Sequence, residues 1–240
     1  MYNYSIPLDP LLPFISNEKL YKEVEEVLSK IDDIKNRSAS NLYKNVIDPF
    51  SALFESIEYG LTLDQWIQRE KARQSQKSLQ NLIGEFHQSI LGDIDGWENL
   101  GTSHVIDLRN ETLRVIAEVK NKFNTTKGNH KTSIYDDLKY LLDTDYKGYI
   151  GYYIEIIPPN KKKYDKPFVP SDNVLKKRRP EREDIRVIDG KSFYYKVTGN
   201  IDALRYLYET LPIVISSILG KQNNQQMYIT DFMSLFERAY

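Results

Sequence analysis

Two short apolar runs near the middle of the chain each lead to an acidic residue, and together they constrain the fold strongly. The first run reaches Asp107, and the second, about ten residues further on, reaches Glu118 and then Lys120. Both runs are rich in the branched residues that favour strands. Because residues i and i+2 of a strand share a face, Glu118 and Lys120 project together while Val119 turns into the core.

The polar residues 109–112 between the two runs predict a turn, so we expect the runs to pair as a hairpin. Asp107 then comes alongside Glu118, and two carboxylates converge on one point with the ammonium group of Lys120. This arrangement suits a Mg²⁺ ion held by carboxylates and phosphate oxygens, with the lysine positioning or activating water. It predicts a site that cuts phosphodiesters. The same residues also fit an ordinary half-exposed strand pair with a surface salt bridge.

The pattern Asp107…Glu118-x-Lys120 resembles the core of the PD-(D/E)xK nuclease superfamily. Longer strings look like one branch of it, the type II restriction endonucleases that cut GGNCC or GGWCC sites. These strings are residues 81–88, Gly96-Trp97 and residues 116–125. The resemblance spans about residues 79–142, and it departs from the superfamily pattern at Ile106, where a proline is expected before the first acid.

The resemblance implies an α/β fold of the restriction-endonuclease-like kind, with a central mixed β-sheet flanked by helices and a helical N-terminal region. It implies that Asp107, Glu118 and the carbonyl group of Val119 hold Mg²⁺. Lys120 then orients the attacking water or stabilises the charged transition state. Related nucleases also carry a glutamate on their first helix, which makes Glu85 a candidate at the edge of the metal site. A solvated helix glutamate is the equally weighted alternative for Glu85.

The resemblance further implies a type II enzyme that cuts double-stranded DNA at a short GC-rich palindrome of the GGNCC type. A palindrome contains two equivalent scissile phosphates, so we expect a homodimer with one site on each strand. A DNA methyltransferase is the expected functional counterpart. The rival hypotheses are a non-catalytic DNA-binding or assembly protein on the same fold, and a repair nuclease or junction resolvase.

Composition limits the class of protein. The 240 residues are 40% hydrophobic and 28% charged, which is typical of a soluble globular protein. A single domain 1–240 is the simplest expectation, with or without a helical subdomain; its regions are a mostly helical segment 1–92, a catalytic core 93–157 and a final segment 158–240. No apolar run approaches a membrane span, and the N-terminus does not resemble a signal peptide. With no cysteine and three histidines, thiolate metal sites are excluded, and we expect a cytoplasmic protein without membrane partners.

A concentrated basic segment stands out against the net charge of −1. Residues 161–191 hold eleven basic and six acidic side chains, so this segment carries +5 and the remaining chain −6. Such a distribution favours a protein that binds DNA phosphates and can release them. Arg178, Arg179 and Arg182 are its candidates for guanine contacts or for phosphate neutralisation, and a solvated charge run is the alternative.

Hydrophobic periodicity predicts the order of elements. Helices are expected over residues 17–31, 40–57 and 62–91, the last opened by a capping box of Thr62 with Gln65. Strands are expected over 103–109, 112–120 and 148–157, with a helix over 133–142 capped by Ser133. Residues 160–182 are expected to form a long basic loop.

The last third of the chain gives two further signals. Asp189-Gly190 lies between two β-rich runs and predicts a tight hairpin. A helix is expected over residues 200–219, interrupted at Pro212, and a last short helix is expected from Thr230.

A polar, small and basic stretch directly after the second acidic run offers donors for phosphates or bases. The DNA-binding candidates in this region are Lys122, Asn124, Thr125, Lys127, Asn129 and Lys131. A solvated connection is the alternative for the stretch, and an ordinary surface lysine is the alternative for Lys122. His87 is expected to be a hydrogen-bonded histidine rather than a ligand, and the tyrosines of 146–164 and 193–208 are expected in core and interface positions rather than as base-stacking platforms.

Overall fold

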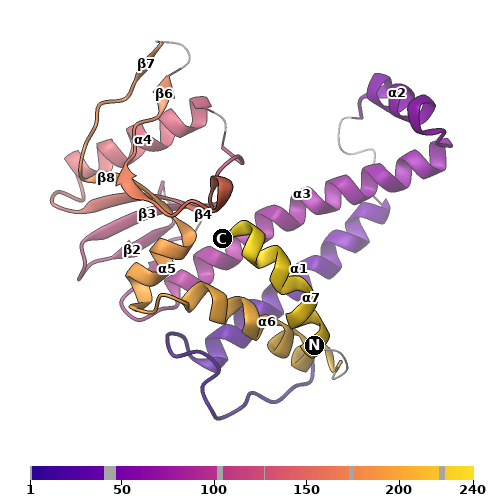
Figure 1. Ribbon diagram of the computed structural model, residues 1–240, viewed down its shortest axis with the longest axis horizontal. Coiled ribbons are helices and arrows are strands. Elements are labelled where there is room, and N and C mark those ends of the chain that lie inside the picture. Colours follow the sequence, from indigo (N-terminus) through magenta and orange to yellow (C-terminus); the bar gives the residue numbers. More distant parts are fainter. Residues whose placement is uncertain (1, 41–46, 102–104, 127, 173–175, 222–224) are drawn as a thin grey trace. The chain divides into compact units, whose positions relative to one another are not determined.

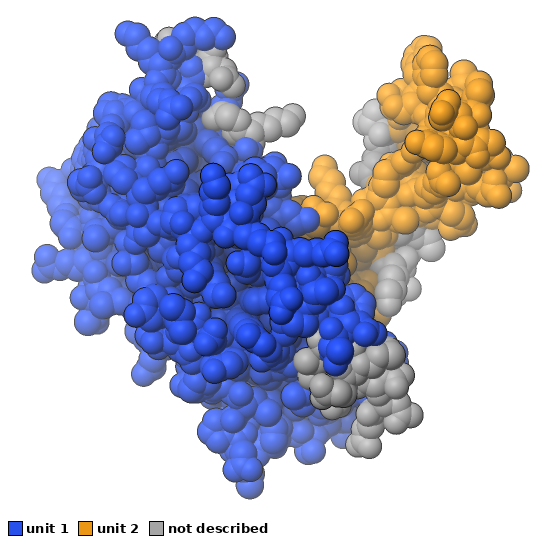
Figure 2. Space-filling view, in the orientation of Figure 1, with its two compact units in different colours: residues 1–25, 84–240 blue, residues 26–83 orange. Residues whose placement is uncertain are grey.

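The computed structural model describes residues 2–40, 47–101, 105–126, 128–172, 176–221 and 225–240 (Figure 1). The chain divides into two compact units (Figure 2). Unit 1 comprises residues 1–25 and 84–240, and unit 2 comprises residues 26–83. Among the described residues, no helix combines the length and the apolar character needed to cross a membrane.

A six-stranded sheet forms the centre of unit 1, in the order β1-β2-β3-β4-β8-β5. Strands β3, β4 and β8 run parallel, whereas β1 and β2 on one side and β5 on the other are antiparallel to their neighbours. The sheet is therefore mixed, and the predicted α/β architecture is confirmed. Its strands are β1 (Glu98–Asn99), β2 (Leu108–Asn110), β3 (Val115–Lys122), β4 (Ile150–Ile157), β5 (Asp165–Pro167) and β8 (Ile185–Asp189).

Helices and a small second sheet complete the described chain. The short sheet pairs β6 (Ser171–Asp172) with β7 (Lys177–Arg178). The helices are α1 (Asn17–Ser40), α2 (Pro49–Tyr59), α3 (Leu63–Gly92), α4 (Gly128–Asp143), the 3₁₀ turn η2 (Pro159–Lys161), α5 (Gly190–Thr198), α6 (Ala203–Leu219) and α7 (Gln225–Ala239).

The two faces of β4 pack against different helices, because alternate side chains of a strand point in opposite directions. Tyr153 joins a buried cluster with Ile134 and Leu138 of α4. Tyr152, its neighbour on β4, packs against Phe193 of α5 with the ring centroids 5.8 Å apart. Helices α4 and α5 thus cover opposite faces of the sheet (Figure 1). The rigid three-layer core fixes the strand that carries the acidic residues.

The N-terminal helical region is confirmed, with different boundaries. The first helix runs on to Ser40, beyond the predicted end. The second begins only at Pro49, because the Asp48 carboxylate accepts a hydrogen bond from the Phe50 amide (2.9 Å) and so caps it. The predicted stretch 41–46 lies outside the described residues. The capping box at Thr62 is confirmed, since the Thr62 amide donates to the Gln65 side chain (2.9 Å).

The predicted hairpin at Asp189-Gly190 is wrong. Strand β8 pairs in parallel with β4 and is followed directly by α5. The Asp189 carboxylate accepts from the Ser192 amide (3.0 Å), so this residue caps a helix. A Cβ at Gly190 would lie 2.4 Å from the carbonyl oxygen of Ile156, so glycine is needed for close packing rather than for a turn.

Three further boundaries differ from the prediction. Helix α4 begins at Gly128, so Ser133 lies inside it and its hydroxyl donates to the Asn129 carbonyl (3.2 Å). Helix α6 continues through Pro212 because Leu207, Val214 and other residues of one face are buried and hold it in place. Helix α7 is longer than expected, and its residue Phe236 packs against Tyr208 of α6.

The predicted strands shift, and the predicted loop 160–182 contains β5, β6 and β7. The first acidic run forms a strand only over Leu108–Asn110, and residues 102–104 of the predicted strand lie outside the described residues. The second runs from Val115 to Lys122, and the third from Ile150 to Ile157. The turn between the first two strands therefore covers residues 111–114 instead of the predicted 109–112.

Candidate active site

The antiparallel pairing of β2 and β3 brings Asp107 next to Glu118. The strands are in register with Leu108 opposite Ala117. Immediately before β2, the Asp107 amide donates to the Ala117 carbonyl (2.9 Å), which extends the ladder by one bond. The Asp107 carboxylate in turn accepts from the Val119 amide (2.7 Å). The side chain of Asp107 is therefore tied to the strand that carries Glu118.

Strand β3 alternates between buried and half-buried residues, as the sequence pattern predicts. Val119 is buried, whereas Glu118 and Lys120 lie together on the other face. The Lys120 ammonium group donates to the Glu118 carboxylate. The Glu118 side chain is only 14% exposed. The structure thus brings the two carboxylates and the ammonium group together.

Burial raises the pKa values of both carboxyl groups, and the positive charge of Lys120 offsets this only in part. Burial raises the pKa of Asp107, although the Val119 amide and the Lys120 charge oppose this shift. Burial, followed by repulsion from Asp107, raises the pKa of Glu118 to about 7, and Lys120 only partly offsets it. Two acids that resist ionisation at one point are a common sign of a site for a cation.

The donor set fits Mg²⁺. Within the described chain, no group of three or more acidic, histidine or cysteine side chains is arranged to hold an ion. Mg²⁺ in proteins is often bound by only one or two carboxylates, with water and phosphate oxygens as its other ligands. Asp107 and Glu118, with the Val119 carbonyl group, meet that requirement.

Glu118 lines a hollow that opens to the outside. A hollow of about 290 Å³ is lined by Glu118 together with Ile106 of the β2 approach and Ile134 and Asp137 of α4. Glu118 therefore faces a space between the sheet and α4 rather than a sealed core.

Helix α3 contributes a polar contact that the sequence analysis did not single out. The Gln88 side chain lies near the Asp107 carboxylate and acts to lower its pKa, which favours the ionised form. Glu85, one turn earlier on the same face, is exposed. Its role at the metal site stays a prediction. His87 is hydrogen-bonded as predicted, with its Nδ1 atom 2.9 Å from the Tyr194 hydroxyl oxygen.

A second buried carboxylate lies on the neighbouring strand. Glu155 of β4 stands opposite Lys120 of β3 in the parallel register, so both side chains point to the same face. Glu155 is 5% exposed, and it accepts from the Lys131 ammonium group (2.6 Å) and from the Tyr164 hydroxyl group. This residue was not predicted as part of the site. An acid inside the apolar run 150–157 was the signal that could have revealed it.

The candidates that follow β3 have varied surroundings. Lys122 is half-buried on the face that holds Lys120. Asn124 is exposed, and the hydroxyl group of the exposed Thr125 donates to the Lys122 carbonyl (2.7 Å). Asn129 is exposed in the first turn of α4. Lys127 lies outside the described residues. The DNA-binding role of this stretch stays a prediction.

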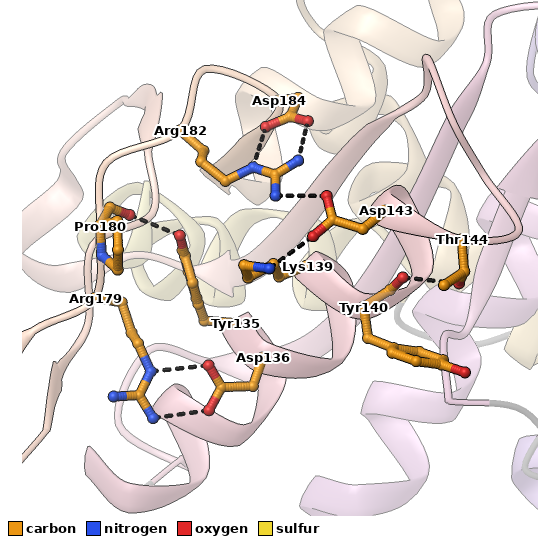
Figure 3. A network of polar contacts seen from close by, with 10 residues as sticks. All are labelled: Tyr135, Asp136, Lys139, Tyr140, Asp143, Thr144, Arg179, Pro180, Arg182 and Asp184. Carbon is orange, nitrogen blue, oxygen red and sulfur yellow. Dashed lines mark hydrogen bonds and ion pairs between the residues drawn. The ribbon is translucent and has the colours of Figure 1, made fainter.

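Two of the three candidate arginines are held by carboxylates of the same chain (Figure 3). The Arg179 guanidinium donates two bonds to Asp136 of α4 (2.8 and 2.7 Å) and a third to Asp172. Arg182 donates in the same way to Asp184 (2.8 and 2.6 Å) and also to Asp143.

Arg178, in contrast, is exposed on β7. DNA contact by Arg179 or Arg182 would require exchange of protein carboxylates for phosphate or base atoms. The DNA-binding assignment of all three arginines stays a prediction.

The mixed sheet flanked by helices has the architecture of the restriction-endonuclease-like class, and it brings two desolvated acids and a lysine together on adjacent strands. Comparison with known proteins narrows the class. The sequence profile of the Eco47II restriction endonuclease family matches residues 12–220. The chain therefore belongs to the Eco47II restriction endonuclease family and is a type II site-specific deoxyribonuclease.

Two relatives show how far the similarity extends. The chain is 41% identical to the type II restriction enzyme Eco47II of Escherichia coli over 237 residues, covering 96% of this chain and 99% of the relative. It is 30% identical to the type II restriction enzyme Sau96I of Staphylococcus aureus over 226 residues, covering 92% of this chain and 84% of the relative. No solved structure matches the chain.

Proposed function

We propose that this enzyme is Mg²⁺-dependent and cuts both strands of a short GC-rich palindrome of the GGNCC type as a homodimer. The Mg²⁺ assignment rests on the buried pair of Asp107 and Glu118. Their pKa values are raised, so a bound cation would stabilise the ionised form of both carboxylates. The GGNCC type of site is inferred from the sequence similarity of residues 79–142 to restriction endonucleases that cut such sites. A paired DNA methyltransferase that protects host sites, and action in the cytoplasm, belong to the same proposal.

Asp107 and Glu118 would hold the ion through carboxylate oxygens, with the Val119 carbonyl group as a third donor. When bound, Mg²⁺ supplies positive charge that polarises the scissile phosphate and stabilises the transition state. The Val119 amide orients the Asp107 carboxylate through the hydrogen bond described above, and Gln88 favours its ionised form. These contacts keep the site in place before DNA arrives.

Lys120 would act directly on the reacting groups. Its ammonium group contacts Glu118 in the structure, and its side chain is 26% exposed, so it remains accessible to substrate. From this position the ammonium group can orient the attacking water or stabilise the negative charge that develops on the phosphate. Glu118 and Lys120 thus share one catalytic unit.

Digestion of an unmethylated plasmid with Mg²⁺ tests the proposal. We expect discrete fragments with Mg²⁺ and none with a chelator, and sequencing of the fragment ends gives the site and the stagger. Prior methylation of the recognition site should protect the plasmid. Binding without cleavage would instead support the non-catalytic rival, and a smear of fragments would support a nonspecific nuclease.

A further inference from the structure

Helix α2 of unit 2 exposes most of its apolar side chains. Phe50, Phe54 and Ile57 are 74%, 75% and 73% exposed. No residue of α2 is buried. A helix of a soluble protein normally turns its apolar side towards the core, so this helix lacks a partner for that side within the described portion of the chain.

The hydrogen bonds between α2 and α3 are made by a polar residue of α2. The Glu55 carboxylate accepts from the indole nitrogen of Trp66 (2.7 Å) and from two guanidinium nitrogens of Arg73 (2.7 and 3.0 Å). The guanidinium of Arg69 lies 5.4 Å from the ring centre of Tyr59. Because α2 uses its polar side to bind α3, its apolar side is left available.

Hollows lie on both sides of the exposed apolar ridge. One of about 810 Å³ is lined by Phe50, Phe54 and Trp66 among others. Another of about 450 Å³ is lined by Leu53, Ile67 and other mostly apolar residues. The same surface therefore offers both projecting side chains and spaces that can receive them.

The exposed apolar area is large enough for a stable interface. It is formed by six side chains that are each 59–75% exposed. With roughly 200 Å² per large apolar residue, these expose on the order of 800 Å², more than the roughly 300–600 Å² of the largest patch on a typical monomer. A standard interface buries about 800 Å² per partner. The six residues, here called the α2 patch, are Phe50, Leu53, Phe54, Ile57, Tyr59 and Leu63.

We propose that a second copy of this chain docks on the α2 patch. The proposal deepens the proposed function, since it rests on the homodimer that cutting both strands of a palindrome requires. A two-fold dimer uses the same surface on both subunits, so that surface must fit itself. The α2 patch offers both parts of such a fit, because its projecting side chains lie next to hollows.

The charges around the patch favour a second copy over DNA as the occupant. Residues 47–73 carry five acidic and three basic side chains, a net charge of −2. A duplex would be repelled by such a surface, whereas a second copy can place its acids near the partner's bases.

A second apolar surface of unit 1 provides the matched control. Helices α6 and α7 enclose a hollow of about 410 Å³. Phe232, which lines it, and Leu235 further along α7 are 47% and 55% exposed, so both are more covered than the two phenylalanines of the α2 patch.

Measurement of the molar mass of the full chain tests the proposal without DNA. We compare the wild type with Phe50→Ser/Phe54→Ser and with Phe232→Ser/Leu235→Ser by sedimentation over a range of concentrations. We expect the wild type and the α7 variant to be dimers, and the α2 variant to dissociate with at least tenfold weaker affinity. An α2 variant that dimerises like the wild type, or dissociation of the α7 variant instead, would overturn the proposal. So would a wild type that is monomeric at all concentrations.

Cysteine cross-linking gives a second readout that does not depend on loss of an interaction. The chain has no cysteine, so a single introduced thiol reports contact between copies. We expect at least one of Phe50→Cys, Leu53→Cys, Phe54→Cys and Ile57→Cys to form a disulfide-linked dimer under mild oxidation. Tyr140→Cys on α4, where the residue is 65% exposed, should not. No cross-link at any α2 position would contradict the proposal.

The two proposals fail in different ways. In one outcome, the wild type is a dimer that cuts no DNA, and the Phe50→Ser/Phe54→Ser variant is a monomer. This result would support the α2 patch and contradict the proposed activity. In the other outcome, the wild type cuts both DNA strands and the Phe50→Ser/Phe54→Ser variant still dimerises. This result would support the activity and overturn the α2 patch.

Discussion

Two charged regions of unit 1 differ in how completely their charges are matched. Around β3, Asp107 and Glu118 share the single ammonium group of Lys120, and burial raises the pKa of both acids. Around α4, Arg179 and Arg182 each bind two carboxylates. A buried group with too little opposite charge indicates a ligand that is still to bind, whereas a run of basic residues does not do so by itself.

Loss of the Glu118 carboxylate, whose charge is only partly balanced by Lys120, should have the largest effect on DNA cutting. Glu118→Gln keeps the shape of the side chain but removes a carboxylate that would hold Mg²⁺, so we expect cutting to fall by at least about 10³-fold, or about 4 kcal/mol. The melting temperature should not fall, because the substitution also removes repulsion with Asp107. Plasmid digestion and thermal unfolding measure both effects. Glu111→Gln, in the exposed turn between β2 and β3, is the control, and a fully active Glu118→Gln would refute the assignment.

Glu155 on β4, whose charge is balanced by Lys131, should matter for stability where Glu118 does not. Glu155 has an ammonium and a hydroxyl partner, so Glu155→Gln leaves Lys131 without its countercharge. We expect a loss of about 3 kcal/mol in the free energy of unfolding, measured by denaturant titration. Equal stability of the Glu118→Gln and Glu155→Gln variants would show that the two carboxylates do not differ in charge matching.

Affinity for Mg²⁺ should depend on pH through Glu118. Its pKa is raised to about 7, so below that pH the carboxyl group holds a proton that must leave before the ion binds. We therefore expect the affinity to rise by up to about tenfold per pH unit below 7 and to level off above it. Calorimetric titration at pH 5.5, 6.5 and 8.0 measures this, and an affinity that does not change with pH would contradict the shift.

The smallest effects should separate the paired from the exposed arginine. Arg179→Ala removes three hydrogen bonds to Asp136 and Asp172, and we expect it to lower stability slightly, because the ion pairs are screened by solvent. Arg178→Ala should leave stability unchanged and reduce the salt dependence of DNA binding by about one phosphate contact. Chemical unfolding and binding at several salt concentrations test both variants. A reversed pattern would place Arg179, rather than Arg178, on the DNA.

The sequence predicts the catalytic strand pair well, because its information is local. The i, i+2 rule places Glu118 beside Lys120, and a polar turn between two apolar runs predicts the hairpin that brings in Asp107. The contacts of Gln88 and Glu155 depend on how α3 and β4 pack against β3, and no local pattern specifies that packing. The partners of Arg179 and Arg182 come from distant residues for the same reason.

The wrong hairpin at Asp189-Gly190 shows a different limit. An aspartate followed by glycine favours a tight turn, but aspartate is equally suited to capping a helix. Which role it takes depends on whether the next strand has a place in the sheet. Here β8 already has β4 and β5 as neighbours, so the chain leaves the sheet and continues as a helix.

The close approach at Gly190 also limits how this enzyme can be altered. Even one added methyl group there would meet the backbone of Ile156 and push apart two layers of the core. That backbone belongs to the strand directly beside β3, so such a change would be transmitted to the acidic pair. Libraries that seek new DNA specificities should therefore keep position 190 constant and vary the exposed residues that follow β3.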